Sequence, residues 1–230
     1  PWCHNGDMEI SQALYTTRAM RRVKPDPIPD EVMAKLLDAA VRAPSGGNTQ
    51  KWRFLIVTDQ AKKSALQKIY SDGLTELNAN QYKSVMDLIQ DGDPNDPEVI
   101  QAKKTYASGR WLADNLDKVP VLLFAWGKPN GESSIFPALW SLQLAATAEG
   151  LGTSLTTLLF KKHTQEVLDI LGAPPVGEWV PMAMITIGYP TGRWGVAKRQ
   201  QPHEVAFQNT WGNPVSWTVP EPLWPSSTDA

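Results

Sequence analysis

The sequence contains little cysteine and little histidine, and its net charge is close to zero. Its 230 residues include one cysteine, Cys3, and three histidines, and 22 Lys and Arg against 24 Asp and Glu give a formal net charge of −2. A single cysteine excludes an intramolecular disulfide, which is typical of proteins from a reducing compartment. Because His4, His163 and His203 stand apart without ligand spacing, we expect no metal site. The balanced charge predicts neither nucleic acid nor an anionic membrane as a partner.

Long apolar runs are absent from the sequence as well. The longest, residues 119–126, is too short to cross a bilayer, so we expect no membrane partner. Residues 1–7 form a polar leader without the apolar core of a signal peptide, which predicts a cytoplasmic protein. The length and the 42% hydrophobic content suit a single buried domain over residues 1–230.

Several familiar ligand motifs begin in this chain but are not completed. Gly150-Leu151-Gly152 lacks a third glycine and follows a predicted helix, so the dinucleotide fingerprint is missing. Residues 91–95 imitate the start of a calcium loop, but Asp96 stands where its glycine belongs and Ala102 where its bidentate glutamate belongs. The sequence contains neither a Gly-Lys-Ser/Thr phosphate loop nor a Gly-x-Ser-x-Gly nucleophile motif. None of these patterns assigns a function.

Apolar periodicity and chain-breaking residues predict helices that alternate with a few strands. Compact apolar runs favour strands at residues 52–58, 119–126 and 179–189, with a further extended stretch at 153–159. Helical spacing predicts helices at residues 8–18, 31–41, 59–78, 98–116, 134–149 and 163–171. We expect an exposed loop at residues 90–97 and an extended C-terminal arm at the proline-rich residues 212–230. The predicted fold class is α+β, an α/β sandwich with a small mixed central sheet flanked by helices.

The first group of residues suited to ligand binding lies at residues 17–25. Arg18, Arg21, Arg22 and Lys24 stand together at the exit of the first predicted helix. A phosphate monoester binds guanidinium groups bidentately, and a cluster of them can carry its double charge. A solvated basic face explains the same cluster equally well.

Two further segments offer ligand contacts. In residues 43–52 a predicted helix ends in a loop of small residues that leads into a strand, and such a loop allows a ligand to approach the backbone closely. A plain turn is the alternative, but it would need fewer special residues. Residues 196–199 end in Lys198 and Arg199, for which surface charge is the alternative.

The order of these motifs resembles the nitroreductase family of flavoproteins. The motifs are Thr-Arg-x-x-Arg-Arg from residue 17, Pro-x-Pro-x-Pro from residue 25, Ala-Pro-Ser-Gly-Gly-Asn-x-Gln-x-Trp from residue 43, Gly-Leu-Gly-Thr-Ser from residue 150, and Ile-Gly-Tyr-Pro from residue 187 followed by Lys-Arg. Each is weak alone, but together and in order they are specific. The family often has Gln-Pro-Trp where this chain has Gln50-Lys51-Trp52.

The resemblance implies FMN, bound without covalent attachment. Arg18 and Arg199, together with Lys198, are expected to hold its phosphate, and Arg22 is expected to lie near the N1 and O2 edge of the flavin. Ala19 and Met20 occupy positions where the family often carries a side-chain phosphate contact. The remaining cofactor contacts implied by the resemblance are Pro44, Ser45, Gly46 and Asn48 from a partner subunit, and Thr156, Thr157 and Leu158 along the N5 edge.

The function implied by the resemblance is that of an NAD(P)H-dependent nitroreductase. NADH or NADPH would reduce the flavin, and a small nitroaromatic or quinone-like compound would then take two electrons in the same site, giving ping-pong kinetics. The chemistry is centred on the flavin, so we expect no catalytic side chain. Tyr70, Trp111 and Phe124 are candidates for an aromatic roof over the substrate, although core packing explains each one singly. Reductive dehalogenation, flavin destruction, dehydrogenation and a non-catalytic flavin-binding protein stay open.

Residues 135–148 predict a helix that is apolar on every side apart from Ser141, Gln143 and Thr147. A helix that is apolar all round must be buried all round. One face can pack on the sheet, and the opposite face then needs another helix or a second chain. The family resemblance implies the second case, a homodimer with FMN at the interface. A central helix buried within a monomer is the alternative.

Overall fold

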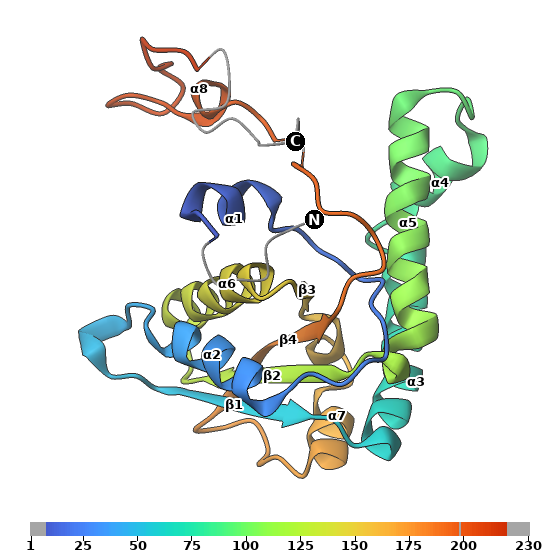
Figure 1. The fold of residues 1–230 in the computed structure, drawn as a ribbon. Coiled ribbons are helices and arrows are strands. Elements are labelled where there is room, and N and C mark those ends of the chain that lie inside the picture. The colour runs from blue at the N-terminus through green and yellow to red at the C-terminus, as the bar shows by residue number, and fades with distance from the viewer. Residues whose placement is uncertain (1–7, 198, 220–230) are drawn as a thin grey trace.

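The computed structural model describes residues 8–197 and 199–219, so the expectations for residues 1–7, for Lys198 and for residues 220–230 lie outside the described residues. The centre of the fold is a four-stranded antiparallel sheet with the strand order β1-β2-β4-β3. β2 and β4 therefore lie inside the sheet, and β1 and β3 lie at its edges (Figure 1). The strands are β1 (Trp52–Val57), β2 (Val121–Gly127), β3 (Gly152–Thr156) and β4 (Val180–Gly188).

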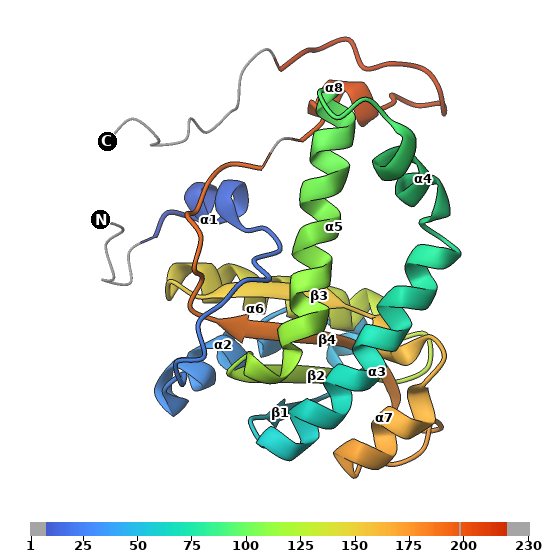
Figure 2. The ribbon, with the colours of Figure 1, turned by 90° about the vertical axis from the view of Figure 1, so that its right-hand side faces the viewer.

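Helices cover both faces of this sheet (Figure 1). One face packs against α2 (Asp30–Val41) and α6 (Glu132–Ala148), and the other against α3 (Gln60–Ala79), α5 (Pro97–Asn115) and α7 (Thr164–Leu171). α3 and α5 extend beyond the sheet and diverge from each other, and α4 (Lys83–Asp91) lies near their far ends (Figure 2). α1 (Ile10–Thr16) contacts α6. The C-terminal segment contains the short α8 (Pro202–Val205), and single helical turns occupy Gly46–Asn48, Leu116–Lys118 and Leu158–Phe160.

The side chains of β2 account for this layering. Every residue of β2 is buried, and successive side chains of a strand point to opposite faces of the sheet. Leu123 packs among residues of α2 and α6, whereas Leu122 and Phe124 pack among residues of α3, α5 and α7. A continuous apolar run is therefore what this strand requires, because helices bury both of its faces.

The structure confirms the predicted α+β fold, and each predicted extended stretch contains a strand. The four strands pair only antiparallel, and the parallel component of the expected mixed sheet is limited to an isolated bridge between Ala19 and Thr153. The loop predicted at residues 90–97 is shorter than expected, because α4 continues through Asp91. Helix α4 itself was not predicted.

The chain between α1 and α2 attaches to the sheet without becoming a regular strand. We call residues 17–24 the basic segment. The Met20 N–H donates to the Thr153 carbonyl at 2.8 Å, and the Lys24 N–H donates to the Tyr189 carbonyl at 2.8 Å. Val23 also forms an isolated bridge with Pro190. These bonds hold the basic segment along the outer edge of β3 and the end of β4.

Two glycines allow the basic segment to approach this closely. A Cβ atom at Gly152 would lie 2.7 Å from the Met20 Cβ, and a Cβ atom at Gly188 would lie 2.7 Å from the Val23 Cβ. Any larger residue at either position would push the basic segment away from the sheet. The glycines of the Gly-Leu-Gly and Ile-Gly-Tyr-Pro motifs therefore have a packing role.

The variant Gly152→Ala tests this packing. We expect it to lower the free energy of unfolding by about 1–3 kcal/mol, the usual cost of inserting a methyl group into a tight contact. Chemical denaturation followed by tryptophan fluorescence measures the change. Gly195→Ala is the matched control, because no atom lies within 4 Å of its added Cβ. Equal losses in the two variants would contradict the proposed close contact.

Candidate functional site

A cavity of about 360 Å³ lies between α3, α4, α5 and the end of β3. Tyr70, Leu74 and Leu77 follow one another at helical spacing and present one face of α3 to it. Ala102, Thr105 and Gly109 do the same on α5. The full lining is Arg21, Tyr70, Leu74, Leu77, Asn78, Tyr82, Val85, Met86, Ala102, Thr105, Tyr106, Gly109, Thr156 and Leu158.

Polar groups meet where the basic segment and β3 reach this cavity. Arg21 is half-buried and lines the cavity beside Tyr70 and Thr156. The Thr156 hydroxyl accepts a hydrogen bond from the Leu158 N–H at 3.2 Å. Burial raises the pKa of the Tyr70 phenol, while its hydrogen bond with Thr156 and the charge of Arg21 act in the opposite direction. The Tyr70 hydroxyl is therefore a neutral hydrogen-bonding group at ordinary pH.

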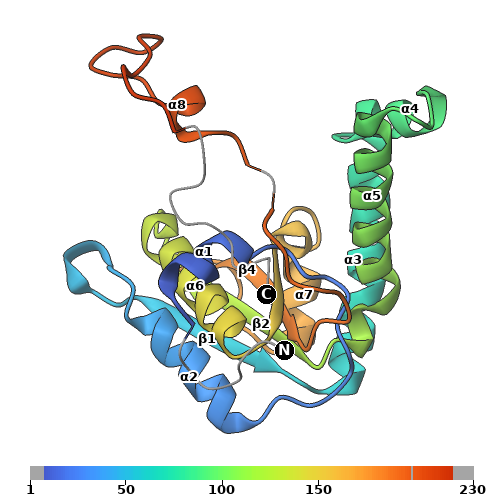
Figure 3. The same ribbon diagram turned by 45° about the horizontal axis from the view of Figure 1, so that its top comes forward.

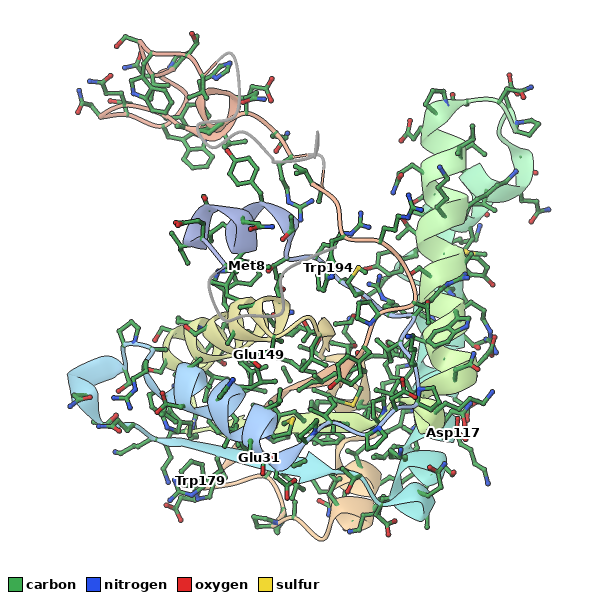
Figure 4. The ribbon with its side chains drawn as sticks, in the orientation of Figure 1. Met8, Glu31, Asp117, Glu149, Trp179 and Trp194 are labelled. Carbon is green, nitrogen blue, oxygen red and sulfur yellow. The ribbon has the colours of Figure 1, made fainter. Side chains whose placement is uncertain are left out.

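The other arginines of the basic segment lie beside the chain that follows β4. Arg18 Nη2 donates a hydrogen bond to the Arg193 carbonyl at 3.0 Å. The side chain of Arg22 is exposed, and the Arg22 carbonyl accepts a hydrogen bond from the Thr191 N–H at 3.0 Å. Figure 4 labels Trp194 in this chain, on the side of the sheet away from Trp179. The structure thus brings Arg18 and Arg22 to the same sheet edge as Arg21.

Ala19 and Met20 differ in their exposure. Ala19 is exposed, but Met20 is buried against Gly152 and its N–H is already bonded to Thr153. The side chain of Met20 therefore packs against the sheet, and the place of Met20 among the cofactor contacts stays a prediction.

Arg199 lines a second cavity, of about 430 Å³, between α1 and residues 196–202. Leu14 and Tyr15 of α1 form its other wall. Lys198, which was expected to share the phosphate with Arg18 and Arg199, lies outside the described residues.

The loop between α2 and β1 is exposed and conformationally unusual. Gly47, Asn48 and Gln50 have φ angles of 57°, 51° and 50°, a left-handed region that costs a non-glycine residue roughly 1–2 kcal/mol. The Ser45 hydroxyl accepts a bond from the Gln50 N–H at 3.1 Å and helps to hold this shape. Backbone strain of this kind occurs often at ligand sites.

This loop carries Pro44, Ser45, Gly46 and Asn48, and none of them is buried. Figures 1 and 3 show the loop at one end of the molecule and the pair α3 and α5 at the other. One chain therefore does not bring these loop residues to the cavity or to β3.

The three aromatic residues predicted to cover the substrate lie in different environments. Tyr70 lines the cavity. Phe124 has no exposed surface and packs with its ring centroid 6.1 Å from that of Phe160, so the expectation that it covers a substrate is wrong. Trp111 packs half-buried against the core and is not among the residues that line the cavity.

The placement of the remaining expected residues is mixed. Thr156 and Leu158 line the cavity, and Thr157 between them is exposed. Arg21, Tyr82 and Tyr106 line it without having been expected there. Arg21 was part of the basic cluster singled out in the sequence, but nothing in the pattern distinguished it from Arg18 or Arg22. Tyr82 gave no such signal, because α4 was not predicted.

The described part of the chain contains neither a metal-binding cluster nor a helix suited to a membrane. Residues 8–197 and 199–219 contain no group of three His, Cys, Asp or Glu side chains placed to hold a metal ion. Within the same ranges, no helix is both long enough and apolar enough to cross a membrane.

The sequence matches the pattern of the Nitroreductase family over residues 14–189. It is 29% identical to 5,6-dimethylbenzimidazole synthase from Rhodospirillum rubrum over 75% of this chain and 78% of that protein. It is 27% identical to iodotyrosine deiodinase 1 from Rattus norvegicus over 80% of this chain, and the match spans 62% of the deiodinase.

Solved structures share this fold. Oxidized iodotyrosine deiodinase bound to FMN and 3-iodo-L-tyrosine superposes with a TM-score of 0.68 at 23% identity, covering 88% of this chain and 99% of that chain. A variant of an FMN and NADPH-dependent nitroreductase from sphigopyxis superposes with a TM-score of 0.65 at 20% identity, covering 89% of this chain and all (100%) of that chain.

The raised pKa of Tyr70 has a measurable effect on stability. A phenol that stays neutral in the folded state contributes stability that is full below about pH 10, the unfolded pKa. This contribution is lost as the pH rises towards the higher folded pKa, by at most about 1.4 kcal/mol per pH unit. Tyr70→Phe should therefore lose less stability than the parent protein between pH 9 and pH 11. Urea denaturation at both pH values measures this, and identical losses would mean that Tyr70 ionises freely.

Proposed function

Because the chain belongs to the nitroreductase family, we propose that it is an FMN-dependent oxidoreductase that uses NADH or NADPH to reduce nitroaromatic or quinone-like compounds. The observation that carries this proposal is the juxtaposition at the edge of β3: a basic segment fixed by backbone bonds lies next to a largely apolar cavity. A cationic edge suits a phosphorylated cofactor, and an apolar cavity suits a flat aromatic substrate.

The residues at this edge fit FMN. Within the described ranges Arg18 and Arg22 have no acidic side chain at ion-pair distance, so their charges are available to an anion. We assign the phosphate to Arg18 and Arg199, and the electron-rich N1 and O2 edge of the flavin to Arg22. Thr156, Thr157 and Leu158 would follow the N5 edge, which lies beside the substrate cavity in this arrangement.

The chain's own contribution to the reaction is placement and charge. FMN, when bound, supplies the hydride transfer itself. Arg22 would stabilise the negative charge that accompanies reduction, and Leu74, Leu77 and Leu158 would exclude water from the substrate. In the first step a nitro compound, NAD(P)H and one proton give a nitroso compound, NAD(P)⁺ and water. Solvent supplies the proton, since the Tyr70 phenol stays protonated.

Reductive dehalogenation is a second candidate for the same site. The similarity to iodotyrosine deiodinase 1, at 27% identity over 80% of this chain, favours it. Tyr70, Tyr82 and Tyr106 also give the cavity hydroxyl groups that suit a polar aromatic compound. Both reactions consume two electrons per turnover and use the same cofactor, so they differ only in the electron acceptor.

We also propose that the active protein is a homodimer. Phe136 and Trp140 of α6 are 37% and 42% exposed, and with the half-buried Leu144 they form an apolar stripe one helical turn apart. Such a stripe on a helix surface suits an interface. The isolated, strained loop at residues 43–50 supports the same proposal, because a second chain could bring it to the basic segment. The C-terminal segment, which stands away from the body (Figure 3), exposes 91% of Trp211 and would suit the same partner.

Cofactor identity and reduction test the proposed function. We expect the purified protein to release FMN rather than FAD on heating, because the chain has a phosphate-binding cluster without a dinucleotide fingerprint. NADH or NADPH should then bleach the bound flavin under anaerobic conditions. Turnover of a panel of nitroaromatics, quinones and halophenols identifies the acceptor class. FAD in place of FMN, or bound FMN that neither nucleotide reduces, would contradict the proposal.

Arg18→Gln tests the phosphate contact. We expect FMN affinity to fall about tenfold to a hundredfold, because the substitution removes a charge-assisted hydrogen bond to a dianion. Fluorescence titration with FMN measures the affinity. Lys68→Gln, an exposed change on α3, is the control for the loss of one positive charge. If Arg18→Gln binds FMN as tightly as the parent and the control do, Arg18 does not hold the phosphate.

A further inference from the structure

The cavity between α3, α4 and α5 carries one formal charge. Arg21 is the ionised residue among those that line it, and the lining contains neither Asp nor Glu. The other lining residues are apolar or carry neutral hydroxyl and amide groups. The cavity is therefore a positively charged site with largely apolar walls.

Arg21, like Arg18 and Arg22, has no acidic partner among the described residues, and it is the arginine of the three that lines the cavity. Two arginines elsewhere in the chain are paired. Arg110 of α5 pairs with Asp114 at 2.6 Å, and Arg42 pairs with Asp38 at 2.8 Å. No carboxylate of the described residues lies within 4.0 Å of Arg21, and the charge of Arg21 acts to lower the pKa of the nearby Tyr70 phenol. A half-buried guanidinium beside apolar walls has lost part of its hydration without gaining an ion pair. Such a group favours binding of an anion.

The neutral polar groups around Arg21 suit the same ligand. The hydroxyl groups of Tyr70, Tyr82 and Tyr106 can donate hydrogen bonds, and Asn78 offers an amide. Leu74 and Leu158 provide flat apolar contact. A volume of about 360 Å³ is at the lower end of the range for small-molecule pockets and suits a compound of one or two rings.

We propose, as a deepening of the proposed function, that the substrate is a small aromatic compound that carries a carboxylate, and that Arg21 binds this carboxylate. The planar guanidinium matches a carboxylate bidentately, whereas a neutral substituent would leave the charge unpaired. The arginines of the basic segment thereby bind different ligands. Arg22, which is exposed, serves the cofactor, and Arg21, which lines the cavity, sets the specificity for the substrate.

A matched pair of ligands tests this proposal. 4-Nitrobenzoate and 4-nitrobenzamide have nearly the same shape and differ in charge. Their affinities for the oxidised, FMN-loaded protein are measured by calorimetry and by the change in the flavin spectrum, without turnover. We expect the parent protein to bind the benzoate at least about tenfold more tightly than the benzamide.

Variants assign the preference to Arg21. Arg21→Gln should lose the preference for the benzoate while its affinity for the benzamide stays unchanged, and Arg21→Lys should keep part of it because the charge remains. Lys68→Gln should keep all of it, since Lys68 is exposed on α3 and is not among the residues that line the cavity. A general structural defect in Arg21→Gln would instead weaken both ligands equally.

Three results would overturn the proposal. The parent protein could bind both ligands equally, Arg21→Gln could retain the full preference, or Arg21→Gln could weaken both ligands to the same degree. If FMN is bound and reduced normally in these samples, only the assignment of Arg21 fails. If the protein binds no FMN, the proposed function fails and this inference fails with it.

Discussion

The backbone pairing of the basic segment with the edge of the sheet is the contact on which the rest of the site depends. The Met20 N–H bonds to Thr153, and Gly152 leaves the room that this bond requires. Once the segment is fixed there, the places of its side chains are fixed as well. Arg21 reaches the cavity, Arg22 stays exposed, and Met20 fills the space above Gly152. A cationic row is thus held by main-chain bonds that do not use the charged groups themselves.

A second constraint is the separation of the site's two halves. The strained loop at residues 43–50 is held by its own hydrogen bonds and by a bond from the Gly46 N–H to the Ser134 hydroxyl of α6, yet most of its residues are exposed. The basic segment and the cavity lie at the opposite end of the sheet (Figures 1 and 3). The apolar stripe of Phe136 and Trp140 gives a surface through which a second chain could join the two halves. Charge, cavity and loop then form one site that neither chain completes alone.

The sequence predicted those features that follow from local patterns. The strand at β2 was predictable because burial on both faces requires a continuous apolar run. Helix α4 was missed although Val85 and Met86 face the cavity, because the helix is short and none of its residues is fully buried. Phe124 was misassigned because an aromatic side chain serves a core and a pocket equally well. Arg21 was overlooked because matching motifs gives positions along a chain, whereas the direction of a side chain depends on the strand beside it.

A mixed dimer tests the two-chain site most directly. Gly46→Phe adds a bulky side chain at a position where no atom of its own chain lies within 4 Å of the new Cβ, and it should block an FMN site on a partner. Arg18→Gln weakens the phosphate contact, so each variant alone should bind FMN poorly. A dimer of one Arg18→Gln chain and one Gly46→Phe chain, isolated with two different affinity tags, should contain one intact site and bind one FMN per dimer with the parent affinity. If the mixed dimer binds FMN no better than the two variant homodimers do, the site is completed within a single chain and the two-chain site is contradicted.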